Sequence, residues 1–345
     1  MSAETRTRTP YVLARAEVRA VDRVSPNFVR VTFGGRDLEE FGTPGDVYDA
    51  RIKLVFPPAS GILPDLDRDT DDWWGSYLAV PEEERGSMRT YSVRSLDVVP
   101  SAELVEASAE LVVPSAELVV PSAELVEASA TEVVVDFVLH LVPGLTGPAS
   151  LWASAAGVGD EVWMVGPRRG RSERGGIEYA PGSASSVMLV GDETAAPAIA
   201  RILEDAPRDL RGLAFIEVPT AEDILPIDAP DGVEVHWLPR GDAAHGLRLI
   251  PTVLDCLGDS AHSKSGDSEI VVQDAEGEDL VWETPIYSGS GEDVAEAASG
   301  ERYFWIAGES GVVTTLRRHL VKDLGIDRAQ VAFMGYWRRG VAMRG

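Results

Sequence analysis

The chain has 345 residues, of which 44% are hydrophobic and 26% are charged, proportions that are typical of globular proteins. Its formal net charge of −26 argues against a general affinity for nucleic acid or for an anionic membrane surface. The single cysteine, Cys256, excludes intramolecular disulfides and thiolate metal clusters and suits a reducing compartment. Residues 1–10 lack the apolar core of a signal peptide, and no apolar run is long enough to span a membrane. We therefore expect a cytoplasmic protein with no nucleic-acid partner, no membrane insertion and no obligate protein partner.

The first half of the chain has the alternating apolar and polar pattern of β-strands. The segments with this pattern are residues 11–21, 28–33, 51–56, 89–96, 131–140 and 160–165. A short helix is expected at residues 148–153, directly after Gly147. Short strands separated by Gly, Pro and Asp turns predict an antiparallel barrel or sandwich.

A tandem repeat interrupts this pattern. Residues 100–109 recur letter for letter at residues 121–130, and a partial copy occupies residues 114–120. Such identity indicates a recent duplication, because packed repeats normally diverge. The repeats are acidic and carry no residue suited to catalysis, so we expect an exposed loop or marginal helix inserted at about residues 98–131. An interaction element is the alternative interpretation.

The second half of the chain alternates strands with helices. Strands are expected at residues 187–190, 213–218, 233–237 and 303–307, and helices at residues 197–203 and 312–324. This order predicts a parallel sheet with helices on both faces. The polar residues 258–300 are expected to form a long loop, interrupted by residues 280–282.

Residues 89–94 read Arg-Thr-Tyr-Ser-Val-Arg and form the most informative motif of the chain. On a strand, Arg89 and Tyr91 share one face, whereas Thr90 and Ser92 share the other. A guanidinium group beside a flat ring and a hydroxyl suits a ligand that combines phosphate with a planar heteroaromatic ring, such as a flavin nucleotide. An ordinary strand with a surface arginine is the alternative for these six residues alone.

Three glycine-containing turns follow expected strands. Residues 143–150 form a turn that enters a helix, where free N–H groups and the helix dipole favour a pyrophosphate, and His140 lies just upstream. Residues 191–197 and 307–310 lie where open α/β sheets bind nucleotides. Neither the G-x-G-x-x-G nor the Walker pattern is present, so a purely structural role for these turns stays open.

The remaining polar groups give weaker signals. Residues 335–340 combine two aromatic rings with two guanidinium groups, which suits an anionic ligand or a solvated terminus. The five histidines have no metal-ligand spacing, so no metal site is predicted. They are His140, His236, His245, His262 and His319.

Taken in order, these motifs resemble the siderophore-interacting protein family of the ferredoxin–NADP reductase superfamily. The matching pieces are residues 89–94, 136–140, 147–152, 191–195, 305–309 and 335–338. The resemblance implies β plus α/β architecture: an N-terminal antiparallel Greek-key FAD-binding barrel over residues 1–182 and a C-terminal parallel-sheet nicotinamide-binding domain over residues 183–345.

The resemblance also implies roles for individual residues. Arg89 would contact the flavin phosphate, Tyr91 would stack on the isoalloxazine, and Ser92 would hydrogen-bond near its reactive N5 edge. The implied cofactor-binding residues are Arg89, Thr90, Tyr91, Ser92, Val138, His140, Gly147, Pro148, Ala149, Ser150, Gly191, Asp192, Glu193, Thr194, Ala195, Gly308 and Glu309. The residues expected to receive an anionic ferric siderophore are Lys322, Arg338 and Arg339.

The implied activity is a reductase that passes electrons from NADPH or NADH through FAD to a ferric siderophore and releases Fe(II). No catalytic side chain is expected, because the flavin carries out the redox step. Glu217 on a ribose hydroxyl would favour NADH, whereas Arg240 on a 2′-phosphate would favour NADPH. The alternatives are a flavin reductase with a protein acceptor and a low-turnover siderophore- or flavin-binding module.

Overall fold

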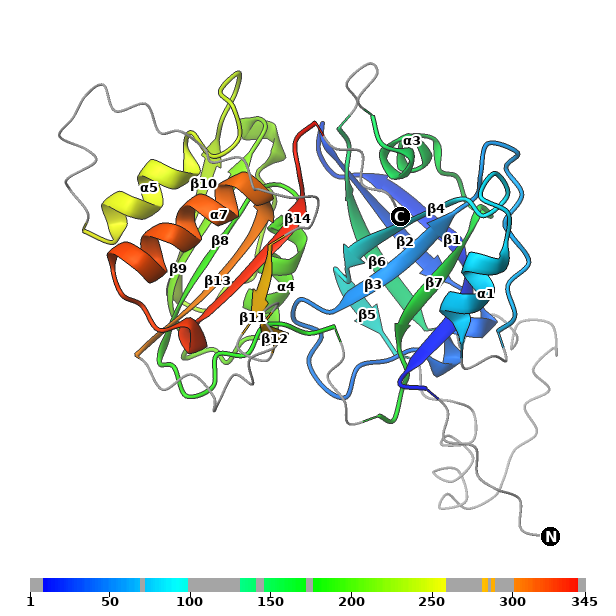
Figure 1. The fold of residues 1–345 in the computed structure, drawn as a ribbon, viewed down its shortest axis with the longest axis horizontal. Helices are drawn as coiled ribbons and strands as arrows, with labels where there is room; N and C mark the ends of the chain where they lie inside the picture. The colour runs from blue at the N-terminus through cyan, green and yellow to red at the C-terminus, as the bar shows by residue number, and fades with distance from the viewer. Residues whose placement is uncertain are drawn as a thin grey trace, which may run out of the picture.

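The chain forms two β-sheets that lie side by side (Figure 1). The computed structural model describes residues 9–68, 72–98, 131–140, 146–171, 176–258, 281–284, 287–288 and 301–340. The first sheet is antiparallel and the second is mostly parallel, so the predicted β plus α/β architecture is confirmed. None of the helices in these ranges has the length and apolar character needed to cross a membrane.

Within the described residues, the first sheet has seven strands and curls around its own core. The strands are β1 (Tyr11–Arg23), β2 (Phe28–Gly34), β3 (Arg51–Phe56), β4 (Ser87–Ser92), β5 (Ser95–Asp97), β6 (Glu132–Val138) and β7 (Glu161–Pro167). Their order across the sheet is β4-β3-β7-β1-β2-β6-β5. Alternate residues point inward, and Phe33, Phe56 and Phe137 are among the side chains that fill the interior.

A sharp bend links the two edges of this sheet. β4 lies at one edge and β5 at the other, and the chain passes between them at Val93 and Arg94. The N–H of Val93 donates to Ala50 (2.8 Å), whereas the next N–H, of Arg94, donates to Val134 (2.8 Å). The prediction of one strand over residues 89–96 is therefore wrong in this detail, because the bend transfers the chain to the opposite edge.

Short helices cover the first sheet. The helix expected at residues 148–153 is present as α3 (Pro148–Ala155). An additional helix, α1 (Trp73–Ala79), packs Tyr77 on the outside of the sheet, and a 3-10 turn, η1, covers Arg36–Glu40. At seven residues, α1 is too short to show a helical period in the sequence.

The repeat insertion leaves the strands on either side of it in register. β5 and β6 are antiparallel neighbours that pair Leu96 with Val133 and Asp97 with Glu132. The insertion of about residues 98–131 thus connects the ends of two adjacent strands. Residues 99–130 lie outside the described residues, so the expected loop or marginal helix stays a prediction.

In the described part of the chain, the second sheet has five parallel strands and an antiparallel hairpin at one edge. The parallel strands are β8 (Ser186–Gly191), β9 (Arg211–Val218), β10 (Gly232–Pro239), β13 (Arg302–Glu309) and β14 (Val331–Trp337). The hairpin strands are β11 (Trp282–Thr284) and β12 (Tyr287–Ser288). The order is β10-β9-β8-β13-β14-β11-β12. The rest of the polar segment expected as a loop, residues 259–280, 285–286 and 289–300, lies outside the described residues.

Helices cover both faces of the second sheet, as predicted. α4 (Ala196–Asp205) packs on one face, whereas α5 (Leu249–Cys256) and α7 (Ser310–Arg318) pack side by side on the other (Figure 1). Because successive side chains of a strand face opposite ways, β8 supplies one core with Val187 and Leu189 and the other core with Met188 and Val190. Short turns complete this half: η2 (Ala221–Asp223), η3 (His319–Asp323) and η4 (Arg328–Gln330).

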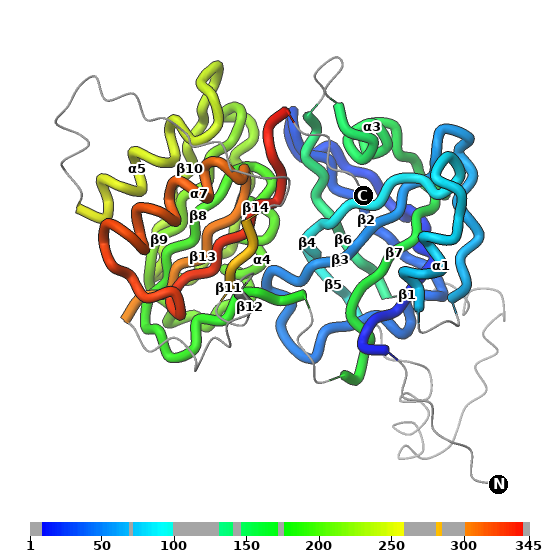
Figure 2. Tube along the Cα trace, in the orientation of Figure 1, coloured from blue at the N-terminus to red at the C-terminus, as the bar shows by residue number. Residues whose placement is uncertain are grey.

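Buried and partly buried carboxylates connect the two sheets. Asp223 accepts from Ser25 and Asn27, Asp205 accepts from the N–H groups of Val47 and Tyr48, and Asp49 accepts from Trp305. Arg94 adds a bidentate ion pair with Glu204, with two distances of 2.6 Å. These contacts join η2, α4 and β13 of the second half to the first half, and β14 lies on the side of the second sheet that faces the first (Figure 2). We propose that the domain boundary lies at residues 182/183, between the end of β7 and the start of β8.

Candidate functional site

The second sheet has a topological switch point between β8 and β13. From β8 the chain proceeds to β9 and β10 on one side, and from β13 to β14 on the other. Open α/β sheets bind ligands in the crevice outside the carboxyl ends of such strands, because the following segments diverge there. The structure places the turns of residues 191–195 and 308–309 side by side at this position.

Asp192 connects the two turns. Its Oδ1 accepts from the backbone N–H (2.9 Å) and hydroxyl (2.5 Å) of Thr194, and its Oδ2 accepts from the N–H of Glu309 (2.8 Å) and Nε1 of Trp337 (2.9 Å). Burial, followed by the nearby Glu193 carboxylate, raises the pKa of Asp192. Gly308 permits this contact, because a Cβ there would lie 2.7 Å from the Asp192 carboxyl group and its φ is +138°.

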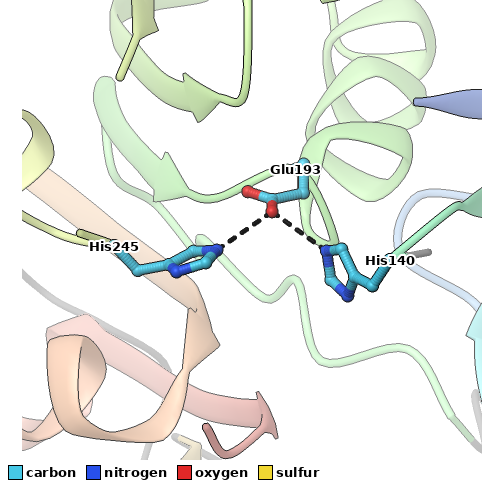
Figure 3. A group of neighbouring side chains, drawn as sticks. All are labelled: His140, Glu193 and His245. Atoms are coloured by element: carbon cyan, nitrogen blue, oxygen red, sulfur yellow. Dashed lines mark hydrogen bonds and ion pairs between the residues drawn. The ribbon is translucent and has the colours of Figure 1, made fainter. Parts of the chain in front are cut away.

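Glu193 forms the centre of a charged cluster at the same edge (Figure 3). Its Oε1 lies 3.0 Å from Nε2 of His140 and 3.1 Å from Nε2 of His245. Arg240 donates to both carboxylate oxygens at 2.7 Å. Burial opposes ionisation of Glu193, but the hydrogen bonds from His140, His245 and Arg240 lower its pKa well below the ordinary value. His140 follows β6 of the first sheet, so the cluster bridges the two halves of the chain.

The two residues expected to select the nucleotide are engaged elsewhere. Arg240 is bound to Glu193, as described above. The buried Glu217 accepts from the N–H groups of Gly246 (2.8 Å), Arg248 (3.1 Å) and Leu249 (3.1 Å) and so caps the start of α5. In this structure, neither side chain is available to a ribose hydroxyl or a 2′-phosphate, and the sequence hypothesis on nucleotide selection loses its basis.

Arg89 and Tyr91 lie on the inward side of β4. The Tyr91 ring packs against Phe137 and Phe56, with centroid separations of 4.6 and 6.3 Å. Arg89 is half-buried, donates to the carbonyl of Met88 (2.6 Å) and makes no ion pair within the described ranges. Burial lowers the pKa of Arg89, which marks a cation that has lost water without gaining a carboxylate partner.

Thr90 and Ser92, from the same motif, lie in different surroundings. Thr90 is exposed on the outer face, where Lys53 donates to its hydroxyl at 3.4 Å. Ser92 is buried and faces the hydroxyl of Tyr336, from β14 of the second sheet. Among the described residues, the buried Tyr336 hydroxyl has no hydrogen-bond partner of good geometry. Ser92 and Tyr336 thus place two hydroxyl groups, one from each sheet, at the boundary.

The start of α3 lies over the same end of the barrel, in contact with β2, β3, β4 and β6. Its N-cap, Gly147, provides no side-chain hydrogen bond, and Pro148 occupies the first turn. A Cβ on Gly147 would meet no atom within 4 Å, so the first turn is accessible. Ala149 is buried, and Ser150 donates to the carbonyl of Val138 at 3.1 Å.

The three residues expected to receive the substrate are not together. Arg338 and Arg339 follow β14 directly, and the N–H of Arg339 donates to Glu309 at 3.2 Å. Lys322 instead follows α7 at its far end, near Leu324, which lines a groove with the first residues of β8 and β13. A helix rises by about 1.5 Å per residue, so α7 and η3 carry Lys322 away from the carboxyl ends of the strands to the end of the sheet at which the parallel strands begin. The grouping of Lys322 with the two arginines therefore does not hold.

Sequence reasoning missed two members of this site. His245 was discounted because its spacing from the other histidines fits no metal motif, and only the fold brings it to Glu193. The partner of Ser92 was also unforeseen, although Tyr336 belongs to the aromatic and arginine-rich segment already noted. Spacing along the chain carried no signal for either contact.

Two family profiles match the chain. The profile of the siderophore-interacting FAD-binding domain matches residues 17–113 and 122–171, and the profile of the siderophore-interacting protein matches residues 184–340. The chain belongs to the siderophore-interacting protein family. The first profile skips residues 114–121, within the repeat insertion, and otherwise covers most of the barrel of this siderophore-interacting protein.

Individual proteins similar to this siderophore-interacting protein agree with that assignment. An uncharacterised protein of Mycobacterium tuberculosis is 31% identical over 94% of this chain and 89% of its own length. The ferric vibriobactin reductase ViuB of Vibrio cholerae is 27% identical over 92% of this chain and 86% of its own length. The crystal structure of a siderophore utilization protein from T. fusca is 28% identical, covers 97% of this chain and 95% of its own, and superposes with a TM-score of 0.62.

Proposed function

We propose that this protein is an FAD-dependent reductase that uses NADPH or NADH to reduce ferric siderophores and release Fe(II) in the cytoplasm. The observation that carries the proposal is Arg89, a half-buried guanidinium group with no ion pair in the described ranges, beside the Tyr91 ring. A partly desolvated cation next to an aromatic ring favours a ligand that unites a phosphate with a flat ring. The family match to a siderophore-interacting FAD-binding domain supports FAD as that ligand.

The residues around Arg89 fit FAD. Arg89 would hold a phosphate, Tyr91 would stack on the isoalloxazine, and the hydroxyls of Ser92 and Tyr336 would supply hydrogen bonds at its redox edge. The Tyr336 hydroxyl supports this fit, since it is buried and makes no hydrogen bond of good geometry within the described residues, which is costly for a polar group. When bound, FAD would accept two electrons as a hydride and deliver them singly to a metal.

The helix α3 fits the diphosphate of FAD. The first turn after Gly147 has no capping side chain, and the positive end of a helix dipole favours an anion there. Ala149 and Ser150 supply N–H groups in that turn, whereas the side chain of Ser150 is held by Val138. His140 stays a proposed cofactor contact through the part of its ring that Glu193 does not engage. Thr90 contributes through its backbone, because its side chain faces outward.

The nicotinamide nucleotide would bind at the switch point. The turns of residues 191–195 and 308–309 would line its crevice, with the partly exposed side chains of Thr194, from the first turn, and of Trp337, at the end of β14. Asp192 and Glu193 would act indirectly, by fixing the shape of both turns through the hydrogen bonds described above. Since Tyr336 of β14 meets Ser92 of β4, the switch point borders the proposed flavin edge, as hydride transfer requires.

The acceptor would be a ferric siderophore. Siderophores hold Fe(III) through hard oxygen donors, which bind Fe(II) more weakly, so one-electron reduction releases the metal. Arg338 and Arg339 would receive an anionic complex near the boundary, where local positive charge must offset the net charge of −26. The similarity to ViuB, whose name states ferric vibriobactin reductase activity, supports this class of acceptor.

The test compares wild type with Arg89→Ala and with Arg19→Ala, an exposed arginine of β1 that pairs with Glu17. Loss of a charge-assisted hydrogen bond of about 1.5–3 kcal/mol predicts FAD binding about 10- to 100-fold weaker for Arg89→Ala. Arg19→Ala should retain wild-type affinity. Equal FAD affinity in all three proteins, or no uptake of FAD by wild type, would refute the proposal.

Anaerobic mixing with NADPH or NADH then tests the electron path. We expect flavin bleaching followed by Fe(II) release from a ferric siderophore, measured with an Fe(II)-specific chelating dye. Bleaching without Fe(II) release from catecholate, hydroxamate or citrate-type complexes would indicate a protein acceptor instead. Absence of bleaching with both nucleotides would indicate a binding module with little turnover.

A further inference from the structure

Three potential metal ligands converge at the boundary between the sheets. His140 follows β6 of the first sheet, Glu193 follows β8 and His245 follows β10 of the second (Figure 3). One oxygen or nitrogen atom from each residue lies within 4.8 Å of the other two. Nε2 of each histidine is directed at the same carboxylate oxygen, Oε1, at 3.0 and 3.1 Å.

That single oxygen has more neighbours than it can bond. Arg240 also donates to Oε1, at 2.7 Å, so three nitrogen atoms lie within hydrogen-bond distance of it. A carboxylate oxygen has two lone pairs, so it cannot accept three well-formed hydrogen bonds. The guanidinium fork takes one lone pair from each oxygen of Glu193. The remaining lone pair of Oε1 is then shared by two imidazoles.

We propose that His140, Glu193 and His245 bind a divalent first-row transition-metal ion between the two sheets. In that state each imidazole directs a lone pair, rather than a proton, at the position that both rings and Oε1 surround. Metal–ligand distances of about 2.0–2.2 Å place neighbouring ligands roughly 3–3.5 Å apart, which matches the separations of both histidines from Oε1. A set of two imidazoles and one carboxylate suits Fe²⁺, Co²⁺ and Zn²⁺ better than Mg²⁺ or Ca²⁺.

Arg240 holds the Glu193 carboxylate in a fixed orientation. Only 8% of its side chain is exposed, and its two bonds fix the plane of Glu193 while leaving one lone pair of Oε1 for the ion. The guanidinium group repels a cation, but the carboxyl group of Asp192 lies in the same turn and interacts with His245. Ordered ligands of a metal are commonly held by such outer hydrogen bonds, which set their orientation.

An ion can reach the cluster from the histidine side. The side chains of His140 and His245 are 35% and 21% exposed, whereas Glu193 is fully buried. The Trp337 ring covers one flank, with its centroid 5.4 Å from that of His140 and 4.8 Å from that of His245. Water can complete the coordination on the open side. The proposed reductase reaction releases Fe²⁺ as its product, so Fe²⁺ would be the natural ion. That identity rests on the proposed function, whereas the existence of the metal site rests on the geometry alone.

Anaerobic titration with Co²⁺, followed by its absorption spectrum, tests the site in the full-length protein. We expect one Co²⁺ per chain in wild type and binding at least about tenfold weaker in His140→Ala and His245→Ala. His236→Ala is the control. His236 lies in β10, stacks on Phe215 and pairs with Glu234 rather than with Glu193. Its affinity should equal that of wild type. No Co²⁺ binding by wild type, or unchanged binding in both alanine variants, would overturn the proposal.

A second measurement keeps the test decisive if a variant does not fold. X-ray absorption by wild type loaded with Zn²⁺ should show two imidazole ligands and one carboxylate, and any other ligand set would contradict the site. FAD content and bleaching by NADPH, recorded on the same preparations, separate this proposal from the reductase function. Co²⁺ binding without bleaching would leave the metal site standing alone, and bleaching with Fe(II) release but no Co²⁺ binding would refute only the metal site.

Discussion

Replacing Asp49 with asparagine should change how the stability of this protein depends on pH. Asp49 is fully buried at the boundary between the sheets. Its Oδ1 accepts from the N–H groups of Glu178 (3.1 Å) and Tyr179 (3.0 Å), and its Oδ2 accepts from Nε1 of Trp305 (2.9 Å). It thereby joins the first sheet, the segment between the sheets and the second sheet.

The magnitude follows from the pKa of Asp49. Burial, opposed by the hydrogen bonds from Tyr179 and Trp305, raises this pKa from 3.8 to about 6. The folded state therefore binds the proton more tightly than the unfolded chain, so the free energy of unfolding falls as Asp49 ionises with rising pH. A shift of about two pKa units corresponds to a loss of about 3 kcal/mol, complete above about pH 7. Of this, about 1.4 kcal/mol develops between pH 5 and pH 8.

Urea unfolding, followed by tryptophan fluorescence from pH 5 to pH 8, measures the effect. Asparagine does not ionise, and its amide nitrogen would face the indole N–H of Trp305, which costs about 1–3 kcal/mol at every pH. This constant cost cancels when the two pH profiles are compared. We expect wild type to lose about 1.4 kcal/mol relative to Asp49→Asn between pH 5 and pH 8.

The exposed neighbour Asp46 provides the matched control, because it lies on the same loop outside the buried boundary. Asp46→Asn should follow the pH profile of wild type. A constant difference between wild type and Asp49→Asn over this range would refute the reasoning. A difference that grows in favour of wild type with rising pH would mean that Asp49 is stabilised as the anion.

Three further outcomes are expected. Gly308→Ala should lower the free energy of unfolding by more than about 1 kcal/mol, seen as a lower Tm, because its Cβ would meet a carboxyl group at positive φ; Gly157→Ala, in open space, should not. Glu193→Gln should cost about 3–5 kcal/mol in urea unfolding, because it leaves a buried guanidinium group without its counter-charge, and an unchanged midpoint would contradict this. Lys322→Ala should leave the KM for a ferric siderophore unchanged in steady-state assays, whereas Arg339→Ala should raise it; equal effects would argue against the separation of these two side chains.

Local sequence patterns were sufficient to predict most of the elements. The alternation in residues 11–21 reflects a strand that is buried mainly on one face, and the continuous apolar run at residues 187–190 reflects a strand that is buried on both. Gly147 before Pro148 predicted the start of α3, because these residues favour a helix entry. α1 was missed, since so short a helix has no detectable period, and the bend after Ser92 was missed because strand periodicity continues through it.

The functional roles of single polar residues depended on the fold. Glu217 and Arg240 each occupy a position that suits a nucleotide contact, yet Glu217 caps α5 and Arg240 holds Glu193. Whether a charged side chain faces a ligand or an internal partner depends on which backbone N–H groups and counter-charges the fold brings to it. Sequence spacing carries no information about those partners.

The sequence by itself determined the two-sheet architecture and the positions of the turns, because both depend on periodicity and on glycine and proline within a few residues. Only the tertiary structure decided that Tyr336 meets Ser92 and that His140 and His245 meet Glu193. The two histidines lie 53 and 52 residues from Glu193 along the chain, on opposite sides of it. Sheet order, set by the burial of many apolar side chains together, brings these loop ends to one edge and so creates the candidate site.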